Sequence, residues 1–162
     1  MEENIIEVRM GEMRGGESPY RLVTRALGSC LGITLYNPLK KLGAMAHPML
    51  PDIERARTNA NPSRYVNYTI RKMVEDLEKA GSAKSRLVAK LFGGARMFAF
   101  ISADSLLNVG EKNIAMAREV FNELNIRIAA EEVGGTFGRT IELNLESGKV
   151  VVDTASWGRK EV

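Results

Sequence analysis

The sequence predicts an α/β or α+β domain in which mixed β-sheets are covered by helices on their outer faces. Apolar residues recur at helical spacing in only two long segments, and strand-like segments precede and follow each of them. The chain of 162 residues is 44% hydrophobic, which suffices for one good core but not for two domains of ordinary size. We therefore expect residues 1–162 to form a single domain.

The first third of the chain contains four strand-like segments. Residues 5–10 alternate loosely between apolar and polar, and a glycine-rich turn follows them. Residues 20–26 and 31–36 are the next two strands. Residues 42–47 are small and apolar, as expected for a strand buried on both faces.

Two helices and an intervening strand are predicted in the middle of the chain. The first helix begins at Asn61, which is suited to capping, has Pro62 at its first position and ends at Gly81. The second covers residues 111–124, whose apolar side chains share one face. The strand between the helices covers residues 86–92 and runs into a pair of glycines.

The last third of the chain is strand-like throughout. Residues 126–133 precede a second pair of glycines, and residues 140–145 and 149–154 flank a turn with the sequence ESGK. We expect the last two strands to form a closing hairpin.

The composition excludes several classes of function. Twenty-three Lys and Arg against 20 Asp and Glu leave a net charge of +3, and no basic run exceeds two residues, so clustered charge for nucleic acid is missing. No apolar stretch is long enough to span a bilayer and no signal peptide is evident, so we expect a cytoplasmic protein. One Cys and one His allow no internal disulfide and predict no metal site and no cofactor. The glycine pairs match no nucleotide-binding fingerprint.

The only cysteine and the only histidine lie close together in the predicted sheet. Cys30 precedes the strand at residues 31–36, and His47 ends the next strand, so two adjacent strands would bring them together. A thiol needs a neighbouring base to act as a nucleophile at pH 7, and His47 is the only imidazole available. Thr24, one strand upstream, has a hydroxyl that can orient the ring without adding charge.

The small residues before Cys30 also suit a nucleophile. Gly28 and Ser29 let a substrate approach the backbone, and main-chain N–H groups there would hold an oxyanion during acyl transfer. The alternative is that Cys30 is a buried core residue and that His47 has a structural hydrogen bond. Spacing alone does not separate these interpretations, nor does it identify the bond that such a site would cleave.

A wider pattern extends along the chain. Its elements are Thr24, LGSC at residues 27–30, GAMAHPMLP at 43–51, GGARMF at 93–98, Asn113, and EVGG with GR at 132–139. This pattern resembles the CheD family of chemoreceptor glutamine deamidases. The resemblance implies a triad of Cys30, His47 and Thr24. Gly28 and Ser29 are candidates for oxyanion or substrate positioning from their place before Cys30. The resemblance also implies two mixed sheets flanked by helices (α/β/β/α), similar to the catalytic domain of cytotoxic necrotising factors.

The resemblance further implies substrates and partners. The substrates would be glutamine side chains on the cytoplasmic helices of chemoreceptors, converted to glutamate by a cysteine amidohydrolase domain covering residues 1–162, and hydrolysis of receptor glutamyl methyl esters stays open. A CheC-like phosphatase would be a second partner. Phe98 and Phe100 are candidate partner-binding residues because they follow a turn among few apolar neighbours, and burial in the core is the alternative. The alternative function is mainly a binding regulator of that phosphatase and of the receptor array. Arg25 is expected near the pocket rim, where its charge would affect which receptor sequence is accepted.

Overall fold

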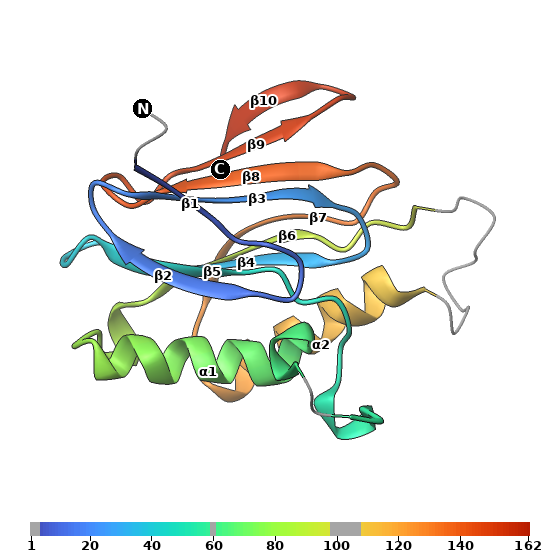
Figure 1. The fold of residues 1–162 in the computed structure, drawn as a ribbon, viewed down its shortest axis with the longest axis horizontal. Helices are drawn as coiled ribbons and strands as arrows, with labels where there is room; N and C mark the ends of the chain where they lie inside the picture. Colours follow the sequence, from blue (N-terminus) through green and yellow to red (C-terminus); the bar gives the residue numbers. More distant parts are fainter. Residues whose placement is uncertain (1–3, 59–60, 98–107) are drawn as a thin grey trace.

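The computed structural model describes residues 4–58, 61–97 and 108–162, and its two sheets and two helices form three stacked layers (Figure 1). Sheets A and B, of five strands each, lie face to face, and both helices cover the outer face of sheet B. Each sheet contains parallel and antiparallel neighbours, so the predicted α+β class with two mixed sheets is confirmed.

Sheet B contains the strand that follows Cys30 and the strand that precedes His47. Its strands, in spatial order, are β2 (Met13–Glu17), β5 (Leu42–Ala46), β4 (Leu31–Asn37), β6 (Val88–Gly93) and β7 (Ile128–Val133). All neighbours are antiparallel except β6 and β7, which are parallel because α2 (Val109–Glu123) connects them. Every residue of β4 is buried, since β4 is central in its sheet and covered on both faces.

Sheet A carries Thr24. Its strands, in spatial order, are β1 (Ile5–Glu7), β3 (Arg21–Leu27), β8 (Arg139–Asn144), β9 (Val150–Thr154) and β10 (Gly158–Glu161). β8 and β9 pair in antiparallel register, so the predicted closing hairpin is confirmed.

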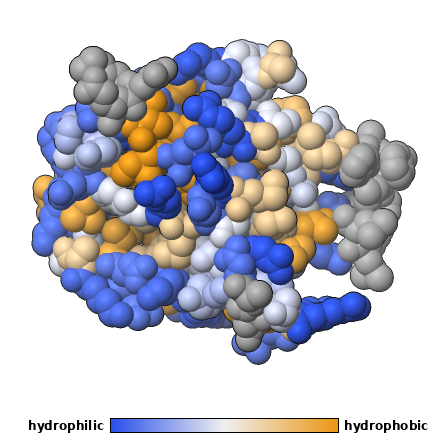
Figure 2. Space-filling view, in the orientation of Figure 1, coloured by the Kyte–Doolittle hydropathy of each residue, from blue (hydrophilic) through white to orange (hydrophobic). Residues whose placement is uncertain are grey.

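Two apolar cores hold the three layers together. Between the sheets, Leu22, Phe92 and Ile141 are fully buried. Between sheet B and the helices, α1 (Val66–Lys79) and α2 bury one face each, with Ile70 and Phe121 fully buried. Figure 2 shows hydrophilic side chains over the outer side of α1, as expected for an amphipathic helix.

Four details differ from the sequence prediction. Both described helices lie on the outer face of sheet B, so the layers are β/β/α and not α/β/β/α. Sheet A can face water on its other side because polar residues alternate along β8 with Ile141 and Leu143, which point into the core. The first α-helix begins at Val66, after a short 3₁₀ turn. The predicted glycine-rich turn is partly strand β2. The polar strand β10 has no apolar alternation and was not predicted.

Candidate active site

Thr24 and His47 form a buried hydrogen-bonded pair between the two sheets. Thr24 comes from β3 of sheet A, and His47 follows β5 of sheet B. The Thr24 Oγ1 atom lies 2.7 Å from His47 Nδ1 and 2.6 Å from the carbonyl oxygen of Val8. A carbonyl only accepts, so the hydroxyl donates to Val8 and must accept from Nδ1–H. This arrangement leaves the lone pair of the ring on Nε2.

The imidazole of His47 is neutral at pH 7. Its ring is buried, and burial lowers the pKa of His47 to about 4 because no carboxylate compensates for the lost hydration of a charged ring. The Nε2 atom is itself buried and has no hydrogen-bond partner among the described residues. A neutral ring with an unpaired Nε2 is equipped to accept a proton.

Cys30 lies in the bend that carries the chain from β3 in sheet A to β4 in sheet B. Its side chain is partly buried and lines a cavity of about 450 Å³. Burial raises the pKa of the Cys30 thiol, against a smaller lowering by its own backbone N–H. Thiol and imidazole are therefore both uncharged at pH 7.

The structure brings the Cys30 and His47 segments side by side, as adjacency of their strands predicts. β4 and β5 are antiparallel neighbours with Ile33 opposite Ala46, so Cys30 and His47 stand at the same end of sheet B. The N–H of Leu31 donates to the carbonyl of Pro48 at 3.1 Å, which links the residues directly after each.

The Cys30 loop is held through its carbonyl groups. Gly28 accepts a hydrogen bond from Ala95 N–H and Cys30 accepts one from Gly94 N–H, both at 2.9 Å. A Cβ atom on Gly93 would lie 2.4 Å from the Cys30 carbonyl oxygen, so only glycine permits this approach. The N–H groups of Ser29 and Cys30 donate to no other described residue, and are available to stabilise an oxyanion.

The second glycine pair, Gly134 and Gly135, is hydrogen-bonded to the segment that contains the first pair, Gly93 and Gly94. Gly134 N–H donates to the Gly93 carbonyl and Arg96 N–H donates to the Gly135 carbonyl, both at 2.9 Å. The buried Arg139 donates to the Gly134 carbonyl at 2.9 Å and forms an ion pair with Glu132. The glycine pairs therefore form tight bends that fix the Cys30 loop.

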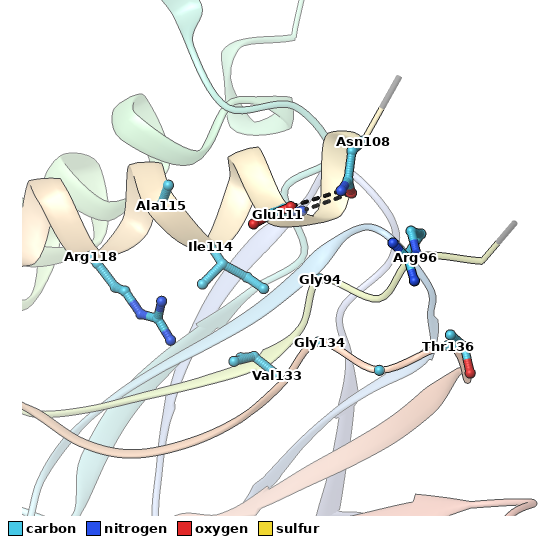
Figure 3. A pocket seen from close by; sticks show the side chains of 11 residues that line it. Gly94, Arg96, Asn108, Glu111, Ile114, Ala115, Arg118, Val133, Gly134 and Thr136 are labelled. Carbon is cyan, nitrogen blue, oxygen red and sulfur yellow. Dashed lines mark hydrogen bonds between the residues drawn. The ribbon is translucent and has the colours of Figure 1, made fainter. Parts of the chain in front are cut away.

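A second cavity of about 480 Å³ lies beside the first, between the start of α2 and the end of β7 (Figure 3). Arg96 and Asn108 line both cavities, and Asn108 is hydrogen-bonded to Glu111 (Figure 3). Sequence reasoning missed Arg96, because a single arginine in a loop carries no signal without its tertiary neighbours.

Arg25 is not among the residues that line the Cys30 cavity, although its neighbour Ala26 is. Arg25 is exposed, lies 3.7 Å from Glu7 in an ion pair, and lines a separate small cavity with Thr140 and Asp153. Arg96 is the charged residue that lines the Cys30 cavity in the described part of the chain. Phe98 and Phe100, the predicted partner-binding residues, lie outside the described residues.

Neither a metal cluster nor a membrane-spanning helix is found in residues 4–58, 61–97 and 108–162. No three His, Cys, Asp or Glu side chains gather there in a way that would hold a metal ion. No helix among these residues is long and apolar enough to cross a membrane.

The fold and the site together describe an α+β domain with a cysteine and a neutral histidine at one end of a sheet. A family model described as "CheD chemotactic sensory transduction" matches residues 49–154. Relatives match over nearly the whole length, including the residues before 49. The chain belongs to the CheD family.

Three relatives show the extent of the similarity, and each is named "Probable chemoreceptor glutamine deamidase CheD". The protein of Desulforamulus reducens is 40% identical over 92% of this chain and 90% of its own length. That of Caldanaerobacter subterraneus subsp. tengcongensis is 38% identical over 100% of both chains. That of Moorella thermoacetica is 42% identical over 92% of this chain and 90% of its own length.

Among solved structures, the crystal structure of Bacillus licheniformis hypothetical protein YfiH is similar with a TM-score of 0.48 and 14% identity. The similarity covers 75% of this chain and 49% of that protein.

Proposed function

We propose that this chain is a chemoreceptor glutamine deamidase, which hydrolyses the side-chain amide of receptor glutamines to glutamate and ammonia. The names of its relatives support the substrate. The observation that carries the chemistry is the Thr24 to His47 hydrogen bond, because it leaves a neutral, unpaired Nε2 in the segment beside Cys30. Residues 1–162 would act as one cysteine amidohydrolase domain in the cytoplasm, where receptor helices are modified.

The first chemical step would begin from an uncharged pair. As Cys30 Sγ forms a bond to the amide carbon, the thiol proton passes to His47 Nε2, and the carbonyl electrons move to the oxygen. The N–H groups of Ser29 and Cys30 donate to no other described residue and would stabilise that oxyanion. Since burial disfavours both charged forms, the proton transfer would accompany the attack instead of preceding it.

The remaining steps release ammonia and glutamate. The imidazolium of His47 gives its proton to the amide nitrogen, the C–N bond breaks, and a thioester stays on Cys30. A water molecule then loses a proton to Nε2 and attacks the thioester carbon. The C–S bond breaks, Sγ takes the proton back from Nε2, and the new carboxylic acid loses its proton to the released ammonia or to water, which leaves glutamate. Thr24 would keep the ring in one tautomer throughout.

Mass spectrometry of a receptor cytoplasmic fragment tests the proposal. Each modified glutamine gains about 1 Da, and the Cys30→Ala variant produces no gain because it lacks the nucleophile. An Asn122→Ala variant, altered on the exposed side of α2, should match the unmodified protein. A receptor fragment that keeps its mass with the unmodified protein would contradict the proposal.

A CheC-like phosphatase remains a proposed second partner, supported by family resemblance. Binding would not need the thiol, so the Cys30→Ala variant should retain the affinity of the unmodified protein for that phosphatase. Substitution of Phe98 or Phe100 should weaken binding. Equal loss with Cys30→Ala would indicate that the phosphatase occupies the site itself.

A further inference from the structure

Asn113 connects the Cys30 loop to the His47 segment from the adjacent helix. It lies on α2 and is fully buried. Its Nδ2 atom donates to the carbonyl oxygens of Ser29 at 2.9 Å and Met49 at 3.0 Å. Carbonyl oxygens can only accept hydrogen bonds, so the NH₂ group of the Asn113 amide, and not its oxygen, must face both of them. One side chain therefore holds the residue before the thiol and a residue just after the imidazole.

The contact with Ser29 fixes the direction of one peptide group. In a trans peptide the C=O and the following N–H point in opposite directions, so holding the Ser29 carbonyl against Asn113 directs the Cys30 N–H away from α2. The neighbouring carbonyls of Gly28 and Cys30 are held by Ala95 and Gly94. The Cys30 N–H donates to no other described residue, and its interaction with its own sulfur lowers the thiol pKa less than burial raises it. The peptide is therefore held in one direction with its N–H open to an acceptor from a substrate.

The other half of the Asn113 amide argues for a role beyond packing. The Oδ1 atom is buried and has no partner among the residues that the structure describes. Buried polar atoms are almost always paired, so an orphaned acceptor is unfavourable for folding. The two donated hydrogen bonds are what the asparagine contributes at this position.

We infer that Asn113 is a positioning residue that orients the Ser29–Cys30 peptide so that the Cys30 N–H serves as an oxyanion donor. This inference deepens the proposed function, on which the identity of the substrate rests. A displaced Ser29 carbonyl would turn the Cys30 N–H away from the developing oxyanion. The hydrogen bonds from Gly94 to the Cys30 carbonyl and from Leu31 to the Pro48 carbonyl would still hold Cys30 and the segment after His47.

Two reagents separate oxyanion stabilisation from simple thiol reactivity. Acylation by p-nitrophenyl acetate forms an S–C bond, moves the thiol proton to His47 and expels p-nitrophenolate through a tetrahedral oxyanion. Alkylation by iodoacetamide displaces iodide and develops no oxyanion. Asn113→Asp is nearly isosteric but sets carboxylate oxygens against two carbonyls, so we expect acylation to fall about 100-fold and alkylation to change less than about threefold. The exposed Asn122→Ala on the same helix is the matched control.

The outcomes are distinct. Equal losses with both reagents, unchanged acylation, or an unmodified protein that p-nitrophenyl acetate does not acylate would each overturn the inference. An unmodified protein that is acylated normally but leaves receptor glutamines intact would refute the proposed function and leave the inference standing.

A measurement on the unmodified protein covers the case in which the Asn113 variants do not fold. A peptide with an aldehyde in place of the glutamine amide would add to the thiol as a hemithioacetal, with its oxygen where the oxyanion forms. The Cys30 amide proton should then shift downfield in the NMR spectrum, as expected for a newly formed hydrogen bond. An unshifted Cys30 amide with the hemithioacetal formed would overturn the inference.

Discussion

The two ends of strand β4 differ in whether the buried polar groups around them have hydrogen-bond partners. At the far end, Asn37 donates to Ser82 at 3.0 Å and accepts from two backbone N–H groups, and the Tyr36 hydroxyl donates to the Leu145 carbonyl at 2.7 Å. At the near end, beside Cys30, His47 Nε2 and Asn113 Oδ1 have no partner in the described part of the chain.

This difference separates groups that stabilise the fold from groups kept available for chemistry. A paired buried group adds to stability, whereas an unpaired one lowers it and retains its capacity to bind or transfer a proton. Substitutions at the near end should therefore change activity most, and those at the far end should change stability alone.

The largest expected effect is on turnover when the base is removed. The His47→Asn variant should lower kcat/KM for receptor deamidation about 1,000-fold, because the described residues that line the Cys30 cavity include no Asp, Glu or His to take the thiol proton instead. The receptor assay by mass spectrometry gives the rate. A loss smaller than about tenfold would contradict the assignment of His47 as the base.

The buried His47 at the near end should also make the free energy of unfolding depend on pH. Burial lowers the pKa of His47 from 6.5 to about 4, so above pH 6.5 the ring is neutral in the folded and unfolded chains. As the pH falls from 6.5 toward 4, the unfolded chain takes up a proton that the folded chain does not, and stability is lost, by up to about 3 kcal/mol.

Urea unfolding at pH 7 and pH 4.5 measures this loss. Carboxylates contribute to acid destabilisation in every variant, so the relevant quantity is the difference between the unmodified protein and His47→Asn. We expect the variant to lose less stability than the unmodified protein over this range. Equal losses in the two proteins would show that burial of His47 carries no such cost.

Removing the orienting hydroxyl should have an intermediate effect. Thr24→Val keeps the shape of the side chain but leaves His47 Nδ1–H and the Val8 carbonyl without their partner. We expect kcat to fall about 10- to 100-fold with little change in KM, because the ring loses its orientation while the substrate pocket is kept. Thr24→Ser retains the hydroxyl and should keep most of the activity. Equal loss in both variants would argue against orientation by the hydroxyl.

The far end provides the smallest expected change in activity. Asn37→Ala leaves the buried Ser82 hydroxyl unpaired and removes the acceptor for two turn N–H groups. The free energy of unfolding should fall by about 2 kcal/mol, with kcat/KM unchanged at temperatures where the variant is folded. A large drop in kcat of the folded variant would remove the distinction between the two ends.

Much of the fold follows from local patterns in the sequence. The buried strands and both helices have strong apolar periodicity, and their segments were located to within a few residues. The exceptions depend on tertiary context. Gly15 and Gly16 have low strand propensity but pair with β5 at the edge of sheet B, and β10 has only exposed residues and exists because it pairs with β9.

The candidate site divides in the same way. The proximity of Cys30 and His47 follows from adjacent antiparallel strands, which a sequence can suggest. The place of Arg96 in the cavity wall and the two hydrogen bonds from Asn113 to the Ser29 and Met49 carbonyls depend on how a loop and a helix pack beside those strands. No local sequence pattern predicts that packing. The layer order also depends on packing, because the alternation along β8 indicates one apolar and one polar face for sheet A but does not indicate which layer covers the apolar face.

The most direct test of the account is a ¹⁵N NMR titration of the imidazole, which is unambiguous because the chain has one histidine. We predict a neutral ring at pH 7 with the proton on Nδ1 and the lone pair on Nε2, and protonation with a pKa of about 4. The Thr24→Val variant should lose the preference for the Nδ1–H tautomer. A ring that titrates near 6.5, or that carries its proton on Nε2 at pH 7, would contradict the assignment of His47 as a base oriented by Thr24.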